Sequence, residues 1–148
     1  MNGESLLVEF NPQLTPKEML ELGVFGGWYF KSLDNMDEYP NDWFKAAKIS
    51  YDGFDVKHNY FKVRSGQTME EWTNNGWITP EDPLGWFQWY CRYYMGRRIP
   101  DVDQFQIKRH NSFGPRHAAA IANNCPGEFD KRPKQRQALL QWGYDPFI

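Results

Sequence analysis

The chain has 148 residues, of which 41% are hydrophobic and 18% aromatic, and its formal net charge is −2. This length predicts one domain with a proper core, and the 7 Trp, 8 Tyr and 11 Phe predict that rings build most of it. No stretch approaches the roughly 20 apolar residues of a membrane span. The N-terminus lacks the basic start and apolar core of a signal peptide, so we expect no membrane association.

The two cysteines, Cys91 and Cys125, form no zinc motif. Isolated thiols of this kind favour a reducing, cytoplasmic location, although a disulfide between them stays open.

Charge is divided unevenly along the chain. Residues 1–85 hold 7 Lys and Arg against 14 Asp and Glu, whereas residues 86–148 hold 10 against 5. The two halves can neutralise each other within a single domain, or they can leave a basic face that attracts phosphate. The sequence does not decide between these two arrangements.

Helix signals are clear in the first half. Thr15-Pro16-Lys17-Glu18 is a capping box, in which a hydroxyl and a carboxylate bond to free backbone N–H groups, and Gly23 is the expected stop. Residues 24–30 indicate a tight loop or a short extended piece, and a second helix is expected from Pro40. The turn signal and the rings and valines of residues 50–64 predict a minor extended or hairpin element that packs on the helices.

Two helices are expected in the middle of the chain. Thr68-Met69-Glu70-Glu71 is a second capping box, with Gly76 as the stop. Thr79-Pro80 then precedes a helix that should end near Arg98. Apolar residues cover most of the circumference of this helix, from Trp86 onwards, which is typical of a central, buried helix.

Three further helices are expected in the last third. Asp101 starts the first, and Gly114-Pro115 should break it because proline has no N–H to donate. A short alanine-rich helix follows from Arg116, and the last helix covers residues 134–142. The predicted fold is mainly α: one compact domain, residues 1–148, with about six short helices around the aromatic helix.

Three segments resemble the signature of a family of small, uncharacterised, aromatic-rich proteins seen in bacteria, fungi and viruses. They are KEMLELGVFGG at 17–27, GWFQWYCRYYMGRR at 85–98 and RQALLQW at 136–142. The resemblance covers most of the chain, but it implies no activity because none is established for that family. It implies a tryptophan after Arg109, where this chain has His110, so we expect different local packing there.

Basic and aromatic residues alternate in the second half of the chain. Because cations bind phosphate and rings stack on unstacked bases, this pattern predicts a face that binds a phosphate-bearing partner, a nucleic acid or a nucleotide. The residues expected to hold the anion are Arg92, Arg97, Arg98, Lys108, Arg109 and Arg116. The residues expected to wall a pocket or to stack are Trp86, Trp89, Tyr90, Tyr93 and Tyr94.

Other interpretations of these residues stay open. Arg92 can pair with an internal carboxylate, and Asp101 and Asp103 are candidate partners for Arg97 and Arg98.

Two other functions are also compatible with the sequence, and whether the protein is an enzyme stays open. A small metal-independent enzyme acting on an anionic metabolite would need a histidine to move a proton, and His58, His110 and His117 are the candidates. The sequence has no metal-binding spacing and no cofactor motif. A protein-interaction factor, for example a viral one, would instead use the acidic half and an exposed aromatic surface.

Overall fold

The structure, a computed structural model, describes residues 9–30, 33–66 and 69–148. Over these residues the fold is mainly α, as the sequence predicts, and no β-strand is formed. The α-helices are α2 (Pro16–Leu22), α3 (Met69–Asn74), α4 (Trp86–Tyr94), α5 (Pro100–Asn124) and α6 (Pro133–Gln141). The 3₁₀ turns are η1 (Phe25–Gly27), η2 (Leu33–Glu38), η3 (Asn41–Trp43) and η4 (Val56–His58).

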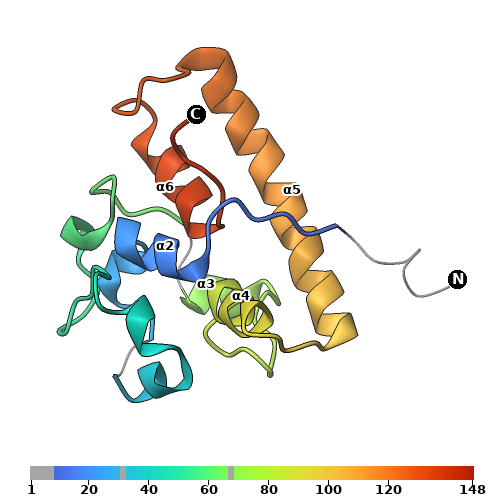
Figure 1. The fold of residues 1–148 in the computed structure, drawn as a ribbon. Coiled ribbons are helices and arrows are strands. Elements are labelled where there is room, and N and C mark those ends of the chain that lie inside the picture. The colour runs from blue at the N-terminus through green and yellow to red at the C-terminus, as the bar shows by residue number, and fades with distance from the viewer. Residues whose placement is uncertain (1–8, 31–32, 67–68) are drawn as a thin grey trace, which may run out of the picture.

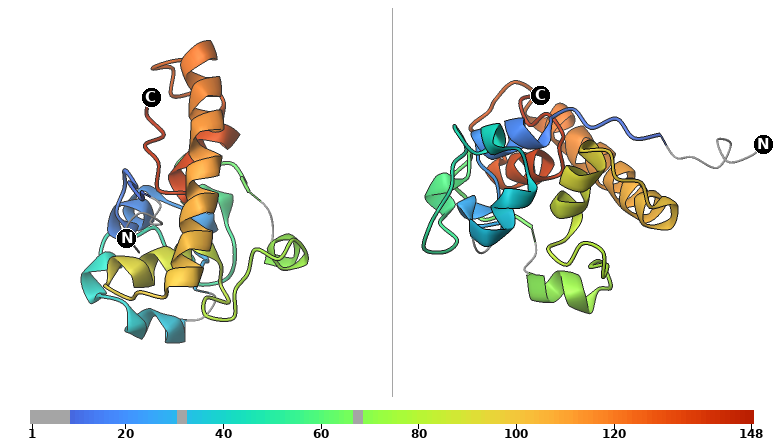
Figure 2. Two further views of the ribbon diagram at one scale, coloured as in Figure 1. Left: turned by 90° about the vertical axis from the view of Figure 1, so that its right-hand side faces the viewer. Right: turned by 60° about the horizontal axis from the view of Figure 1, so that its bottom comes forward.

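The aromatic helix α4 is central, as expected. It packs against α2 and against the first half of α5, while α6 packs on α5 as well (Figure 1). The short helix α3 stands to one side of these packed helices (Figure 2). Of the helices described, none combines the length and the apolar character that crossing a membrane requires.

Rings with hydrogen-bonded polar ends build the core around α4. Phe87, Trp89 and Tyr90 are buried in one cluster with α2 and the loops that follow it. The Trp89 indole N–H donates to the Asp103 carboxylate (2.8 Å), and the Tyr90 hydroxyl donates to the Leu14 carbonyl (2.6 Å). Because a buried ring costs free energy only if its polar atom lacks a partner, these bonds let one short helix bury so many aromatic residues.

Helix α5 contradicts the expected break at Gly114-Pro115, because it runs unbroken for 25 residues with Pro115 inside it. Proline removes only one backbone donor, and tertiary packing holds the helix together at this turn. The Tyr144 ring lies directly over Gly114, where an added Cβ would come within 2.0 Å of it. The Tyr144 hydroxyl also donates to the His110 carbonyl (2.5 Å), one turn earlier. The two expected helices are therefore one.

Residues 50–64, predicted to form an extended or hairpin element, do not form a hairpin. This segment forms the single 3₁₀ turn η4 and loops, because three of its backbone N–H groups bond to the loop around η1 and its internal backbone bonds are short-range turns rather than strand pairs. A Cβ at Gly27 would lie 2.7 Å from the Ser50 nitrogen, so glycine is needed for this close approach. The three bonds run from Ser50 N–H to the Gly27 carbonyl (2.9 Å), from Asp55 to Gly26 (3.0 Å) and from Tyr60 to Gly23 (3.1 Å).

Several expected helix ends can be compared with the structure. The capping box at Thr15 is confirmed, since its hydroxyl accepts from Glu18 N–H and the Glu18 carboxylate accepts in return. The helix expected from Pro40 is only the 3₁₀ turn η3. The aromatic helix ends at Tyr94 rather than near Arg98, because Gly96 adopts a φ of 112° that helices do not allow.

Two further expectations concern the second capping box and the two cysteines. The second capping box involves Thr68, which lies outside the described residues. Both cysteines are buried and free, so the disulfide left open by the sequence is absent. Burial also raises the pKa of the Cys91 thiol well above its ordinary value.

Candidate functional site

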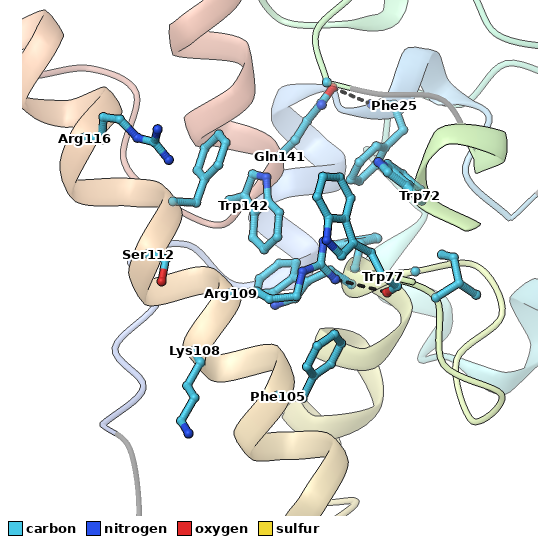
Figure 3. A pocket seen from close by; sticks show the side chains of 16 residues that line it. Phe25, Trp72, Trp77, Phe105, Lys108, Arg109, Ser112, Arg116, Gln141 and Trp142 are labelled. Atoms are coloured by element: carbon cyan, nitrogen blue, oxygen red, sulfur yellow. Dashed lines mark hydrogen bonds between the residues drawn. The ribbon is translucent and has the colours of Figure 1, made fainter. Parts of the chain in front are cut away.

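A cavity of about 580 Å³ lies between α5, the start of α4, the end of α6 and the segment around α3 (Figure 3). This volume falls within the range of small-molecule binding sites. We call it the aromatic pocket, because eight rings line it: Phe25, Trp72, Trp77, Trp86, Phe87, Phe105, Phe113 and Trp142. Its charged lining residues are Lys108, Arg109 and Arg116, and no Asp or Glu is among the lining residues that the structure describes.

One face of α5 supplies a wall of the pocket. Phe105, Arg109 and Phe113 lie four residues apart, so the helical repeat brings them into one row. Lys108, Ser112 and Arg116 form a second row beside the first, also at spacings of four. The second row depends on the helix being unbroken, since Arg116 follows Pro115, whereas the first row ends before Gly114.

Rings from other elements form the opposite walls. Trp142 at the end of α6 packs against Trp86 (ring centroids 4.9 Å apart) and is stacked with Phe113 (5.0 Å). Trp72 lies against Gly85, where an added Cβ would meet its ring at 3.2 Å. The site is therefore built from segments that are distant in sequence. Burial of their rings brings them together, and hydrogen bonds such as that from Phe25 N–H to Gln141 Oε1 (3.2 Å) add to it.

Arg109 lies in the middle of the aromatic pocket. Figure 3 shows its side chain reaching across to Trp77, with Trp142 and Phe105 on either side. Its Nη1 donates to the Trp77 carbonyl (3.1 Å) and to Gln106 Oε1 (3.0 Å). The guanidinium carbon lies 5.2 Å from the ring centroids of both Trp77 and Trp142.

The charge on Arg109 lacks a counter-ion among the described residues. All its partners are neutral, and it forms no ion pair with any carboxylate described. Burial lowers the pKa of Arg109 to about 10, which still leaves the guanidinium charged at neutral pH. A half-buried cation of this kind is a site that an anion would stabilise.

Arg92 and Arg97, by contrast, already have carboxylate partners. Asp82, which is 0% exposed, accepts from Arg92 Nη1 (3.0 Å) and from Arg97 Nη1 and Nη2 (2.9 and 2.7 Å). Glu38 accepts two further bonds from Arg92 (2.6 and 2.9 Å). We call these four residues the Asp82 cluster. The partners suggested by the sequence, Asp101 and Asp103, are not the ones that form these pairs.

The remaining residues predicted for the site are dispersed. Arg98 lies over the Tyr93 ring, 3.6 Å from its centroid, and donates to the Tyr93 carbonyl. Trp89 and Tyr90 are buried in the core, and Tyr94 is exposed at the far end of α4. Of the residues predicted from the sequence, the structure thus brings four together at the pocket: Trp86, Lys108, Arg109 and Arg116.

No histidine lines the pocket among the residues described. His110, 1% exposed, is stacked between Trp86 (ring centroids 5.4 Å apart) and Tyr144 (4.2 Å). Burial lowers the pKa of His110 to about 4. His117 stacks on Phe113 (4.2 Å), and His58 belongs to η4. These positions give no support to a proton-transferring histidine beside a bound anion.

Sequence reasoning missed most of the pocket rings. A signal for Phe105 and Phe113 exists, because both repeat with Arg109 at a spacing of four within the helix expected from Asp101. The spacing alone does not distinguish a pocket wall from an apolar contact of the core. Trp72, Trp77 and Trp142 come from separate segments, and no local pattern joins them.

No protein-family model, curated protein or solved structure matches this chain. Among the described residues, no three His, Cys, Asp or Glu side chains are grouped so that they could hold a metal ion. The functional proposal therefore depends on the geometry and charge of the aromatic pocket.

Proposed function

We propose that the protein binds a phosphate-bearing ligand with a planar base, a nucleotide free or within a nucleic acid, in the aromatic pocket. The observation that carries this proposal is Arg109, a half-buried cation among rings with no carboxylate partner among the described residues. A phosphate at Arg109 would supply the missing counter-charge. A base would occupy the space between the indoles, where stacking is worth about 1–3 kcal/mol per base.

Both halves of such a ligand are needed to match the pocket. A lone phosphate would leave most of a cavity of about 580 Å³ unfilled, and an uncharged ring would leave Arg109 without an anion. Three of the six cations predicted to hold phosphate line the pocket, namely Lys108, Arg109 and Arg116. Arg92 and Arg97 belong to the Asp82 cluster, and Arg98 lies against Tyr93.

The proposal is tested by calorimetric titration with adenosine monophosphate, adenosine and inorganic phosphate. We expect the nucleotide to bind at least about tenfold more tightly than either part alone, since charge-assisted bonds and stacking both contribute. Quenching of tryptophan fluorescence reports occupancy, because four of the seven Trp line the pocket.

Two variants locate the binding. Arg109→Ala should weaken nucleotide binding by about tenfold or more, as expected for loss of one charged phosphate contact. Arg98→Ala is the matched control, because Arg98 lies against Tyr93 outside the pocket, and it should bind like the wild type. Equal affinity of the wild type and Arg109→Ala would refute the proposed site.

A further inference from the structure

A row of polar side chains runs along α5 at the edge of the pocket. Lys108, Ser112 and Arg116 are all exposed. They follow one another at four residues, so the row rises about 6 Å per step and about 12 Å in total. Figure 3 shows Lys108 and Arg116 on opposite sides of Arg109 along the helix. The row therefore extends beyond the reach of a single phosphate bound at Arg109.

These three side chains have no ion-pair or side-chain hydrogen-bond partner among the residues that the structure describes. Neither Lys108 nor Arg116 forms an ion pair with a described carboxylate, and the Ser112 hydroxyl makes no hydrogen bond to a described residue. Salt bridges within the described part of the protein occur elsewhere, mostly in the Asp82 cluster. A positive track next to a ring-lined pocket is thus left available to an anionic chain.

Phe105 adds an exposed ring at the edge of the pocket. It is 38% exposed, although it belongs to the same face of α5 as the half-buried Arg109 and Phe113. An exposed ring beside a cationic track offers a flat surface on which a second base can stack. A free mononucleotide would use neither this ring nor both ends of the track.

We infer that the ligand is single-stranded nucleic acid, with one base in the aromatic pocket and the backbone along Lys108, Ser112 and Arg116. This inference rests on the proposed function, since it extends the same pocket. The phosphates on either side of the inserted base follow the row, and a neighbouring base stacks on Phe105. Double-stranded nucleic acid is disfavoured, because its bases are paired and stacked and must be extruded before one can enter a pocket.

The inference is tested with 5′-phosphorylated thymidylate strands of one, two, four and eight nucleotides and with a duplex of the longest, titrated at two salt concentrations. Affinity should rise with length up to roughly four nucleotides, the lower limit of comparable single-strand sites. The slope of log K against log salt should be about −2 for the longest strand, as expected for three phosphate contacts at about −0.7 each.

The double variant Lys108→Ala/Arg116→Ala separates the track from the pocket. It should weaken the eight-nucleotide strand about tenfold more than it weakens thymidine monophosphate, because only the strand reaches both ends of the track. It should also flatten the salt slope for the strand by about 1.4, which is two contacts at about 0.7 each. The control Lys131→Ala/Lys134→Ala removes the same charge from exposed lysines outside the pocket lining and should leave both affinities unchanged.

The outcomes distinguish the two proposals. Binding of the mononucleotide without any gain from strand length, or equal binding of the duplex, overturns the inference and leaves the proposed function intact. Adenosine triphosphate that binds as tightly as the longest strand, and depends equally on Lys108 and Arg116, overturns it in favour of a nucleoside polyphosphate. If neither the mononucleotide nor any strand binds, the proposed function itself fails.

Discussion

The Asp82 cluster and the aromatic pocket use the same kind of side chain in opposite ways. In the cluster, the guanidinium groups of Arg92 and Arg97 meet two carboxylates, one of them fully buried. In the pocket, Arg109 meets only a carbonyl, an amide oxygen and the faces of rings. The comparison teaches that an arginine marks a candidate binding site only where the fold leaves its charge uncompensated.

Arg136 shows a third arrangement. It is fully buried, and its guanidinium bonds to backbone carbonyls on both sides of α6 rather than to carboxylates. It joins the C-terminal segment to the end of α5, which makes it a structural residue. The carbonyl acceptors belong to Cys125, Glu128, Lys131, Pro146 and Ile148.

The largest effect on stability is expected at Asp82. Asp82→Asn should lower the free energy of unfolding by about 3 kcal/mol, because it leaves two partly buried guanidinium groups without their shared carboxylate. Urea denaturation followed by circular dichroism measures the change. The nucleotide affinity of the folded variant should equal that of the wild type, and a loss of affinity would show that the two regions are coupled.

His110 stacks on Trp86, one of the rings that line the pocket. Because His110 is a buried base whose charge depends on pH, the pH dependence of stability tests how it is packed. Its pKa in the folded protein is about 4, below the ordinary value of 6.5, so the unfolded chain binds a proton between these values and the folded protein does not. The contribution of His110 to the free energy of unfolding is therefore fully present above pH 6.5 and is lost as the pH falls toward 4. The full loss would be about 3 kcal/mol at about 1.4 kcal/mol per pKa unit.

The variant His110→Phe keeps a flat ring between Trp86 and Tyr144 but cannot bind a proton. We expect its melting temperature to fall less than that of the wild type between pH 7 and pH 4. Measuring the difference between the two proteins cancels the contribution of Glu38, whose pKa Arg92 holds below the ordinary value. If the melting temperatures of the two proteins fall by the same amount between pH 7 and pH 4, His110 is not buried in a neutral form.

The smallest effect on stability is expected at Arg109. Arg109→Met should change the free energy of unfolding by less than about 1 kcal/mol, because two hydrogen bonds are lost while an uncompensated charge is removed from a half-buried place. The same denaturation experiment measures it. A loss as large as that of Asp82→Asn would mean that Arg109 holds the fold together in the way Arg92 does.

The sequence by itself determined the fold class, the central aromatic helix and the first capping box, because these follow from local spacing and from the amount of ring surface to be buried. It also identified the basic second half. It misjudged α5, since the effect of Pro115 depends on Tyr144, which lies 29 positions further along the chain and packs over Gly114.

Only the tertiary structure decided which cations are paired. Asp82 reaches Arg92 and Arg97 through a turn whose geometry no spacing rule predicts, and Trp77 and Trp142 meet around Arg109 from segments 65 residues apart in the sequence. Local patterns fix secondary structure because their interactions lie within a turn or two of the helix. The compensation of a charge depends on long-range packing, and in this protein packing leaves Arg109 without a carboxylate partner among the described residues.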